Sequence, residues 1–549
     1  MNTPRGFAST ISCLLKTTLL RIVALFVSAI LPVGAAPVEP LDAAAQELVT
    51  AETRLRESER LLKSNPDSVG AKWNHSIYLE NLADLLAKRG QSGDAEKVVH
   101  YYTRSLALRE ALIQSTLHKA ARGAANVARD VSIALTKLGD FLSMRGQPGD
   151  VDKAVGYLSR SLEIMEPVIK AGPASEQTTR DGAVVFLKLG FCLVTRGQRG
   201  DADKAIGYFA RSVELMEPLR KANPALEVNA QIVSESLNQL GKSLVARGEP
   251  GDEDAALGHL RRSLEIREAL LAAKPDSADA KRNVSLTLET IAFSAAARRD
   301  KGDMDKAIAH YTRCMELKES LLKANPDSPE ATREVAVISG QLGALLARRG
   351  GPGQIENAFA HLTRSLALTD SLLKAKPASP QALRDSAIVL SAMGDFFSNR
   401  GEPGDDASAL DCFTRGLKLA ETRLKANPGF TEATRAIAVS LLIKLGDSLA
   451  KRGQPGDSEK ALAYFTRCVE PGAALLKTNP RSMEATRNLA VVHYKIAAAA
   501  DQRGDSKASE KHARAAHDLL KTAINGGMTF DPEIVKLYEA LTSQLHPVL

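Results

Sequence analysis

Apolar residues recur every three or four positions along most of the chain, in stretches of about twenty residues that end at Gly or Pro. Over residues 330–349 they stand at Ala331, Val335, Ile338, Leu342 and Leu346. This spacing puts them on one face of a helix. Ser328 and Pro329 supply an N-cap and a first-turn proline, and Gly350 supplies a left-handed stop. The pattern predicts a helix over 330–349.

A second helix is predicted to follow each such helix. It opens at an Asp, for instance Asp405 or Asp457, whose side chain we expect to accept hydrogen bonds from the first-turn amides. It ends near a proline, in most repeats part of an Asn-Pro or Lys-Pro pair, because proline cannot continue a helix. Prolines occupy this place at Pro173, Pro224, Pro275, Pro326, Pro377, Pro428 and Pro480.

The turn between the two helices recurs along the chain as a motif. It reads Arg-Gly-Glu-Pro-Gly-Asp at 400–405, and versions of it begin at Arg89, Arg145, Arg196, Arg247, Arg298, Arg349, Arg452 and Arg503. From Arg145 to Arg400 every step is 51 residues. A fixed period of this length indicates a tandem array. We therefore predict an all-α fold, an α-solenoid of about eight to nine helix-turn-helix repeats with capping helices at both ends.

The predicted organisation has four parts. Residues 1–35 form a signal peptide, 36–66 an N-terminal capping helix, 67–525 the repeat array and 526–549 a C-terminal capping helix. The leader has basic residues, an apolar run over 22–31, and Val33-Gly34-Ala35 before the expected cleavage point. The protein is thus expected to be exported, to the periplasm or the extracellular space. The alternative is a membrane anchor formed by an uncleaved leader.

The composition limits the function classes. The formal net charge is +7. Charged residues make up 25% of the chain, and basic and acidic residues are interspersed. We expect a solvated surface and no nucleic-acid partner.

The cysteines predict buried thiols. After Cys13 in the leader, single cysteines lie far apart in separate repeats, at Cys192, Cys314, Cys412 and Cys468. A disulfide framework or a zinc site would need closer, regular spacing. The row His259, His310 and His361 lies on successive second helices, and packing positions are expected for it too. We expect no metal and no cofactor.

Small and bulky residues identify the type of repeat. The first helix carries a small residue at Gly139, Gly190, Gly241, Gly343 or Gly446. The second helix carries an Ala and, four residues on, a bulky residue, as in the pairs Ala307 and Tyr311 or Ala409 and Phe413. With the closing proline, this pattern over residues 41–525 resembles the tetratricopeptide repeat (TPR), in a long form similar to that of kinesin light chains. The resemblance implies a concave groove, lined by the first helices, that binds a peptide or a partner helix.

Two rows of residues lie in phase with that groove. The first is a ladder of arginines: Arg129, Arg180, Arg282, Arg333, Arg384, Arg435 and Arg487. The second varies from repeat to repeat: Asp140, Phe191, Lys242, Phe293, Asp395 and Asp447. A constant cationic row beside a varied row is typical of a groove that clamps a peptide backbone or carboxylates and reads side chains separately. The alternative is that each Arg pairs with an acid of the neighbouring repeat and stabilises the stack.

A further arginine ladder on the second helices, from Arg104 to Arg467, is expected to bridge adjacent repeats. No phosphate loop, HExxH or GxSxG motif is present in the sequence, so catalysis is not expected. The expected function is that of an exported scaffold that binds other proteins. The alternative is a receptor or substrate-delivery subunit that binds acidic peptide or glycan for an exported enzyme or envelope-assembly machine.

Overall fold

The computed structural model describes residues 43–116, 121–170, 175–297, 301–351, 353–426, 431–480 and 482–545. In these ranges the chain forms helices joined by short turns, as predicted, and no strand. The predicted signal peptide lies outside the described residues. The helices are α2 (Ala43–Ser64), α3 (Val69–Arg89), α4 (Asp94–Thr116), α5 (Ala121–Arg145), α6 (Asp150–Lys170), α7 (Glu176–Arg196), α8 (Asp201–Ala222), α9 (Glu227–Arg247), α10 (Asp252–Ala273), α11 (Ala278–Ala297), α12 (Lys301–Ala324), α13 (Pro329–Arg349), α14 (Gln354–Ala375), α15 (Pro380–Arg400), α16 (Asp405–Ala426), α17 (Thr431–Arg452), α18 (Asp457–Thr478), α19 (Met483–Gln502), α20 (Ser506–Asn525) and α21 (Pro532–Leu545).

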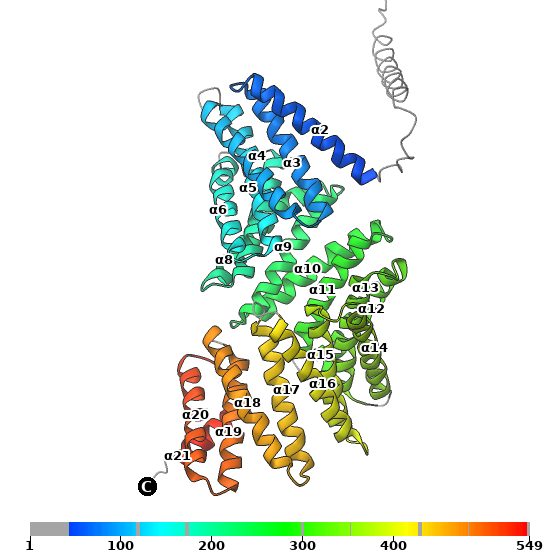
Figure 1. The fold of residues 1–549 in the computed structure, drawn as a ribbon, viewed down its shortest axis with the longest axis vertical. Helices are drawn as coiled ribbons and strands as arrows, with labels where there is room; N and C mark the ends of the chain where they lie inside the picture. Colours follow the sequence, from blue (N-terminus) through cyan, green and yellow to red (C-terminus); the bar gives the residue numbers. More distant parts are fainter. Residues whose placement is uncertain are drawn as a thin grey trace, which may run out of the picture. The chain divides into compact units, whose positions relative to one another are not determined.

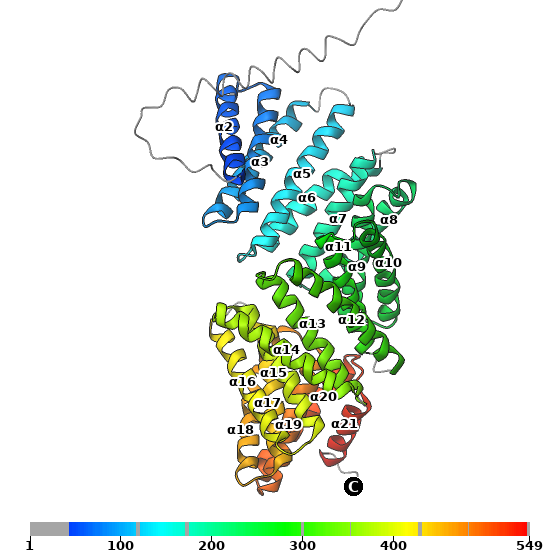
Figure 2. The same ribbon diagram turned by 90° about the vertical axis from the view of Figure 1, so that its right-hand side faces the viewer.

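The chain divides into two compact units, Met1–Arg196 (unit 1) and Gly197–Leu549 (unit 2). The boundary falls within a turn motif. In each unit the helices pack as consecutive pairs, and each pair packs on the next in chain order (Figures 1 and 2). Such stacking lets each pair bury the apolar face of its neighbour, so the array needs no single central core.

The predicted caps of the first helices are confirmed. At α13, the Ser328 hydroxyl accepts a hydrogen bond from the backbone N–H of Ala331, and Pro329 is the first helical residue. The helix ends where the backbone N–H of Gly350, at φ 63°, donates to the carbonyl of Leu346. Only glycine adopts this left-handed conformation without steric cost.

The turn Asp has a different role from the predicted one. In the 400–405 turn, Arg400 donates from Nη2 to Asp405 Oδ1 at 2.6 Å and from Nε to Oδ2 at 2.9 Å. The carboxylate also accepts from the backbone N–H of Glu402, three residues upstream, so it closes the turn and does not cap the first helical turn. The equivalent Asp94, Asp150, Asp252 and Asp457 bind their turn in the same way. Five of the turn motifs are thus folded clamps of one Arg and one buried Asp, whereas Asp505 accepts from the backbone N–H of Ala508 and caps α20 as predicted.

The two helices of a pair meet where glycine faces a bulky side chain. A Cβ on Gly139 would lie 2.9 Å from Cγ of Leu158, and one on Gly343 would lie 2.9 Å from Cγ of Leu362. At Gly394 it would overlap the Phe413 ring. The small and bulky residues of the repeat therefore interlock, as their spacing predicts.

The buried thiols are also confirmed. Cys192, Cys314, Cys412 and Cys468 are free and buried. Cys314 Sγ donates to the carbonyl of Ser285, a residue of its own helix pair, at 3.3 Å. At the same position in other repeats, Ser263 and Ser365 donate to the carbonyls of Ser234 and Ala336, both at 2.6 Å. Cys314, and Cys468, whose Sγ donates to the carbonyl of Val439, therefore stand in for a serine that joins the two helices of a repeat.

Candidate functional site: the first-helix stripe

The candidate site is the face of the first helices that carries both predicted rows. We call it the first-helix stripe. In each first helix it comprises three positions: ten residues before the small residue, six residues before it and one residue after it. Side chains at these three positions lie on one side of a helix. In unit 2, α13 packs against α15 and α15 against α17. Within the described ranges, successive second helices show no comparable packing. The first helices, which carry the stripe, therefore lie on the inner side of the stack in unit 2.

Three of the seven candidate arginines are bound to an acid of the next repeat or cap. Arg129 Nε donates to Asp181 Oδ2 at 2.5 Å, and Arg333 Nε donates to Asp385 Oδ2 at 2.5 Å. Arg487 Nε lies 3.4 Å from an Asp531 carboxylate oxygen at the start of α21. These contacts join successive repeats. They agree with the alternative stated above, in which the arginines pair with acids of the neighbouring repeat and stabilise the stack.

Two candidate arginines keep an available charge. Arg282 reaches only Asp279 of its own helix, at 3.8 Å, and that aspartate is 91% exposed. Such a pair contributes little to stability. Arg384 is exposed and forms no ion pair with any residue that the structure describes. Arg180 lies half-buried on α7.

Arg435 does not lie on the stripe. The extra residue in α17 places Arg435 eleven residues before Gly446, where the other candidate arginines stand ten before their small residue. One residue rotates a side chain by about 100° around a helix. The burial pattern agrees, since Thr434, twelve before Gly446, is buried like Ala382, twelve before Gly394. Ala436 occupies the stripe position in α17.

All three aspartates of the varied row are paired with a lysine of the next repeat. Lys188 Nζ lies 2.7 Å from Asp140 Oδ1, Lys444 Nζ lies 2.5 Å from Asp395 Oδ2, and Lys495 pairs with Asp447. Lys137 and Asp84 form the same pair at 2.7 Å. These lysines were not predicted as partners, although Lys two residues before the small residue recurs in four first helices.

The middle of the varied row has no such pairs. Phe191 is half-buried and Phe293 is 59% exposed. Lys242 is half-buried on α9, and desolvation lowers its pKa from the ordinary value. The row therefore changes character along the array, from ion pairs to apolar and cationic side chains.

Acidic residues near the second helices are held in buried ion pairs. Arg109 lies 2.9 Å from Glu80, and Lys318 lies 2.8 Å from Glu289. Arg267, which is 2% exposed, pairs with Glu235. Removing one partner of such a pair leaves an uncompensated buried charge. Each of these acids is thus paired with a buried basic side chain of its own helix pair.

The second arginine ladder bridges repeats, in agreement with the sequence. Five of its members reach an acid on the preceding second helix: Arg104 and Glu59, Arg160 and Glu110, Arg262 and Glu217, Arg364 and Glu319, and Arg467 and Glu421. Arg211, Arg313 and Arg415 pair within their own helix. All are well exposed, so each contact is worth about 1 kcal/mol at most.

The histidine row does not form a metal site. His259, His310 and His361 lie half-buried on three different second helices, and burial lowers the pKa of each. Within the described ranges, no three His, Cys, Asp or Glu side chains converge to hold a metal ion.

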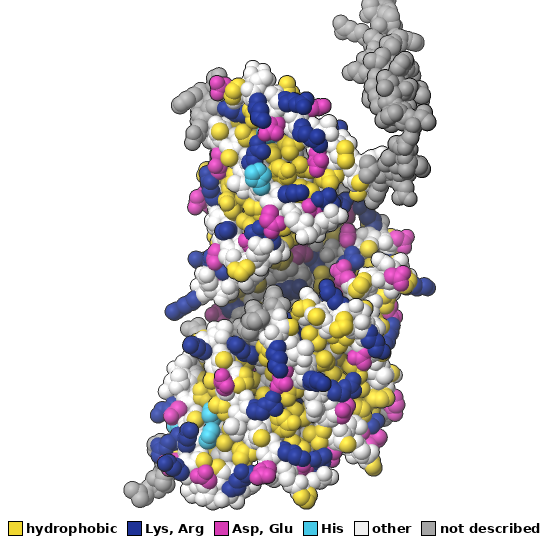
Figure 3. All heavy atoms as spheres, viewed as in Figure 1, with side chains coloured by type: hydrophobic (Ala, Val, Ile, Leu, Met, Phe, Trp, Pro, Cys, Tyr) yellow, Lys and Arg dark blue, Asp and Glu magenta, His cyan; other side chains and the backbone are white. Residues whose placement is uncertain are grey.

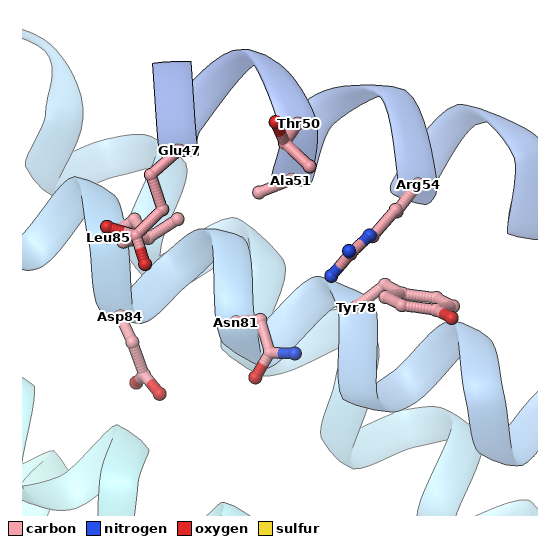
Figure 4. A pocket seen from close by; sticks show the side chains of 8 residues that line it. All are labelled: Glu47, Thr50, Ala51, Arg54, Tyr78, Asn81, Asp84 and Leu85. Carbon is pink, nitrogen blue, oxygen red and sulfur yellow. The ribbon is translucent and has the colours of Figure 1, made fainter. Parts of the chain in front are cut away.

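A polar cavity of about 440 Å³ lies between α2 and α3 in unit 1 (Figure 4). Glu47, Thr50 and Arg54 of α2 face Tyr78, Asn81 and Asp84 of α3 across it. A second cavity of about 310 Å³ shares Arg54 and Tyr78 with the first. Together they line the side of α2 on which a preceding first helix would pack.

The rest of the surface agrees with the composition. On the face shown in Figure 3, basic and acidic side chains are interspersed, with apolar side chains between them. In the part of the chain that the structure describes, no helix has both the length and the apolar character needed to cross a bilayer.

These features define the chain as a helical-repeat protein of the α-solenoid class. The repeat is tetratricopeptide-like: a family model described as tetratricopeptide repeat matches residues 290–324, from the end of α11 through α12. No curated protein sequence matches the chain significantly.

Several solved structures are similar in fold. The quorum sensor NprR from B. thuringiensis in its apo form aligns with a TM-score of 0.44 and 14% identity, over 82% of this chain and 98% of that one. BtubC (BKLC) from P. vanneervenii aligns with a TM-score of 0.37 and 20% identity, over 51% and 92%. Yeast Tom70 aligns with a TM-score of 0.33 and 15% identity, over 91% and 96%.

Proposed function

We propose that the protein is an exported scaffold that binds other proteins through the first-helix stripe and has no catalytic activity of its own. The observation that carries this proposal is the uneven use of charge on the stripe. Arg129 and Arg333 form ion pairs with an aspartate of the next repeat, whereas Arg384 is exposed and has no ion pair with the described residues. A preformed stack loses little conformational entropy on binding, so many weak contacts can add up to useful affinity.

A second candidate is a receptor or substrate-delivery subunit that binds acidic peptide or glycan for an exported enzyme or envelope-assembly machine. It is favoured by Arg282 and Arg384, which present guanidinium groups with at most one weak ionic partner in the described chain. Guanidinium groups bind carboxylates through paired hydrogen bonds. Both candidates use the same surface and differ in what they bind.

Affinity capture of the chain from Ala36 onward, from the exported fraction of its own source, tests the proposal. We expect one partner to be retained at low salt and released at high salt, because exposed charges are screened beyond about 8 to 10 Å. Failure to retain any partner at either salt concentration would contradict the proposed function.

A further inference from the structure

Part of the stripe in unit 2 exposes apolar side chains that no described residue covers. Leu286 and Phe293 of α11 are 43% and 59% exposed, and Ile388 of α15 is 42% exposed. Leu286 and Phe293 are seven residues apart and therefore lie on one side of α11. Val337 of α13, half-buried, holds the position between Leu286 and Ile388 in the stack. The four form an apolar strip across three successive first helices.

Cations border this strip. Arg282 and Arg384 each lie one helical turn before the apolar residue of their helix, Leu286 and Ile388. Arg282 has only its 3.8 Å contact with the exposed Asp279, and its buried Nε has no hydrogen-bond acceptor among the described residues. Lys242 of α9, at the position of Phe293 one repeat earlier, has no ion pair within the described part of the chain.

Three acids near these cations are engaged elsewhere, and Glu334 of α13, at the place where Asp181 and Asp385 bind arginines, forms no ion pair with Arg282 within the described chain. Asp385 is 5% exposed and binds Arg333. Glu235 pairs with Arg267, and Glu289 pairs with Lys318. The surface between α11 and α15 therefore combines exposed apolar groups with two arginines that have at most one weak ionic partner in the described chain.

Other parts of the stripe differ in this respect. In unit 1, Asp84, Asp140 and Asp181 are each paired with a basic residue of the next or preceding repeat. Towards the C-terminal end of α15, beyond the strip, Asp395 pairs with Lys444, and Asp447 of α17 pairs with Lys495. There the stripe is held by its own ion pairs, and a charged ligand would have to displace them.

We propose that the strip of Leu286, Val337, Ile388 and Phe293, with Arg282 and Arg384 at its edge, is the docking site for an acidic amphipathic segment of a partner protein. The apolar edge of that segment covers the strip, and its carboxylates pair with the two arginines. Charge complementarity selects this occupant, since a basic segment would be repelled and an uncharged one would leave the arginines unpaired. The inference rests on the proposed function and assigns it a location and a partner chemistry.

The test uses labelled peptides of about 18 residues, or five helical turns, and fluorescence anisotropy. The main probe has Leu at helical spacing with Glu on the adjacent positions. Two matched probes replace every Glu by Gln or every Leu by Ser. We expect the chain from Ala36 onward to bind the Leu and Glu probe at least about tenfold more tightly than either matched probe. Equal binding of the three probes, or no binding of the main probe, would overturn the proposal.

Variants of the protein locate the site. Phe293→Glu, and the double variant Arg282→Glu with Arg384→Glu, should each weaken binding of the main probe at least about tenfold. Matched controls are Met144→Glu, which changes a side chain that is 71% exposed on α5, and Arg313→Glu on the exposed side of α12. The controls should bind as the unchanged protein does. Circular dichroism and thermal unfolding confirm that each variant is folded, and Phe293→Ala replaces Phe293→Glu if the latter is not.

Failure of this inference can be told apart from failure of the proposed function. If affinity capture retains a partner and these variants retain it equally well, the function stands and the docking site is wrong. If capture retains nothing, the proposed function itself fails.

Discussion

The side chain of Asp405 shows how much one residue of the turn motif does. It is 3% exposed, accepts two hydrogen bonds from Arg400 and one from the backbone N–H of Glu402, and begins α16. Arg400 holds the pKa of this carboxyl below its usual range. Because the folded-state pKa is below the unfolded one, the clamp stabilises the fold above about pH 4 and the contribution is lost as the pH falls.

Asp405→Asn should remove the charge of the clamp and keep the size of the side chain. Hydrogen bonds to charged groups are worth about 1.5 to 3 kcal/mol, so we expect a loss of about 2 kcal/mol in the free energy of unfolding at neutral pH. Urea unfolding at pH 7 and at pH 3 measures this. The difference between the two proteins should shrink at pH 3, because the carboxyl of the unfolded chain is largely protonated there. Asp406→Asn, next in sequence and exposed, is the control and should change little.

Another residue-scale effect concerns the two histidines between α19 and α20. His493 Nδ1 and His512 Nδ1 are 2.8 Å apart, so one ring donates and the other accepts. Burial, then His512 and Lys511, lowers the pKa of His493 to about 4. A lowered histidine pKa stabilises the fold above the unfolded value of about 6.5, and this stability is lost as the pH falls from there towards 4. His493→Gln should therefore flatten the pH dependence of thermal unfolding between pH 7 and about 4. An unchanged slope would contradict this assignment.

At the scale of the helix pair, stability depends on fit between a glycine and a bulky partner. Gly394 on α15 faces Phe413 on α16 so closely that a Cβ would overlap the ring. Gly394→Ala should cost about 1 to 3 kcal/mol, as overpacking does. Phe413→Leu should cost less than about 2 kcal/mol alone and should recover part of the loss when combined with Gly394→Ala. Chemical unfolding of the two single variants and the double variant measures the coupling. Strictly additive losses would show that the two residues do not interlock.

Helix pairs and their register could be predicted from the sequence because their signals are local. Caps, the closing proline and the small and bulky residues lie within one repeat, so their spacing fixes α13 or α16 almost to the residue. The ion pairs could not be predicted in the same way. Whether Arg333 meets an acid depends on Asp385, 52 residues away on the next first helix, and Arg384 has no acid at the equivalent place. Arg435 was misplaced because a repeat period counts residues and ignores the rotation that one added residue causes.

At the scale of the whole molecule, the array must end without exposing the face that an internal repeat buries. When the sequence is aligned on the Asn-Pro pairs at 65 and 325, the residues of α2 correspond to those of α12, a second helix within the array. Where α12 has buried Ala307, Cys314 and Leu317, α2 has exposed Glu47, Arg54 and Glu57. The cavities between α2 and α3 line this polar face (Figure 4). This face of α2 is thus polar and exposed among the described residues, as we expect of a terminal repeat.

Replacing the polar residues of this face of α2 by apolar residues like those of α12 should therefore change the association of the protein with itself more than its folding. The triple variant Glu47→Ala, Arg54→Leu and Glu57→Leu would join Leu61, which is 63% exposed, in a continuous apolar face on α2. Exposed apolar faces of this size associate with one another. We expect the variant to sediment as a concentration-dependent dimer or larger species, with helical content and thermal unfolding close to those of the unchanged protein. The matched control makes the same kind of change away from this face, with Thr53→Ala, Arg56→Leu and Arg60→Leu on the exposed side of α2. If the triple variant stays in the same state of association as the unchanged protein, the polar residues of α2 do not act as the end of the array, and another element must cover that face.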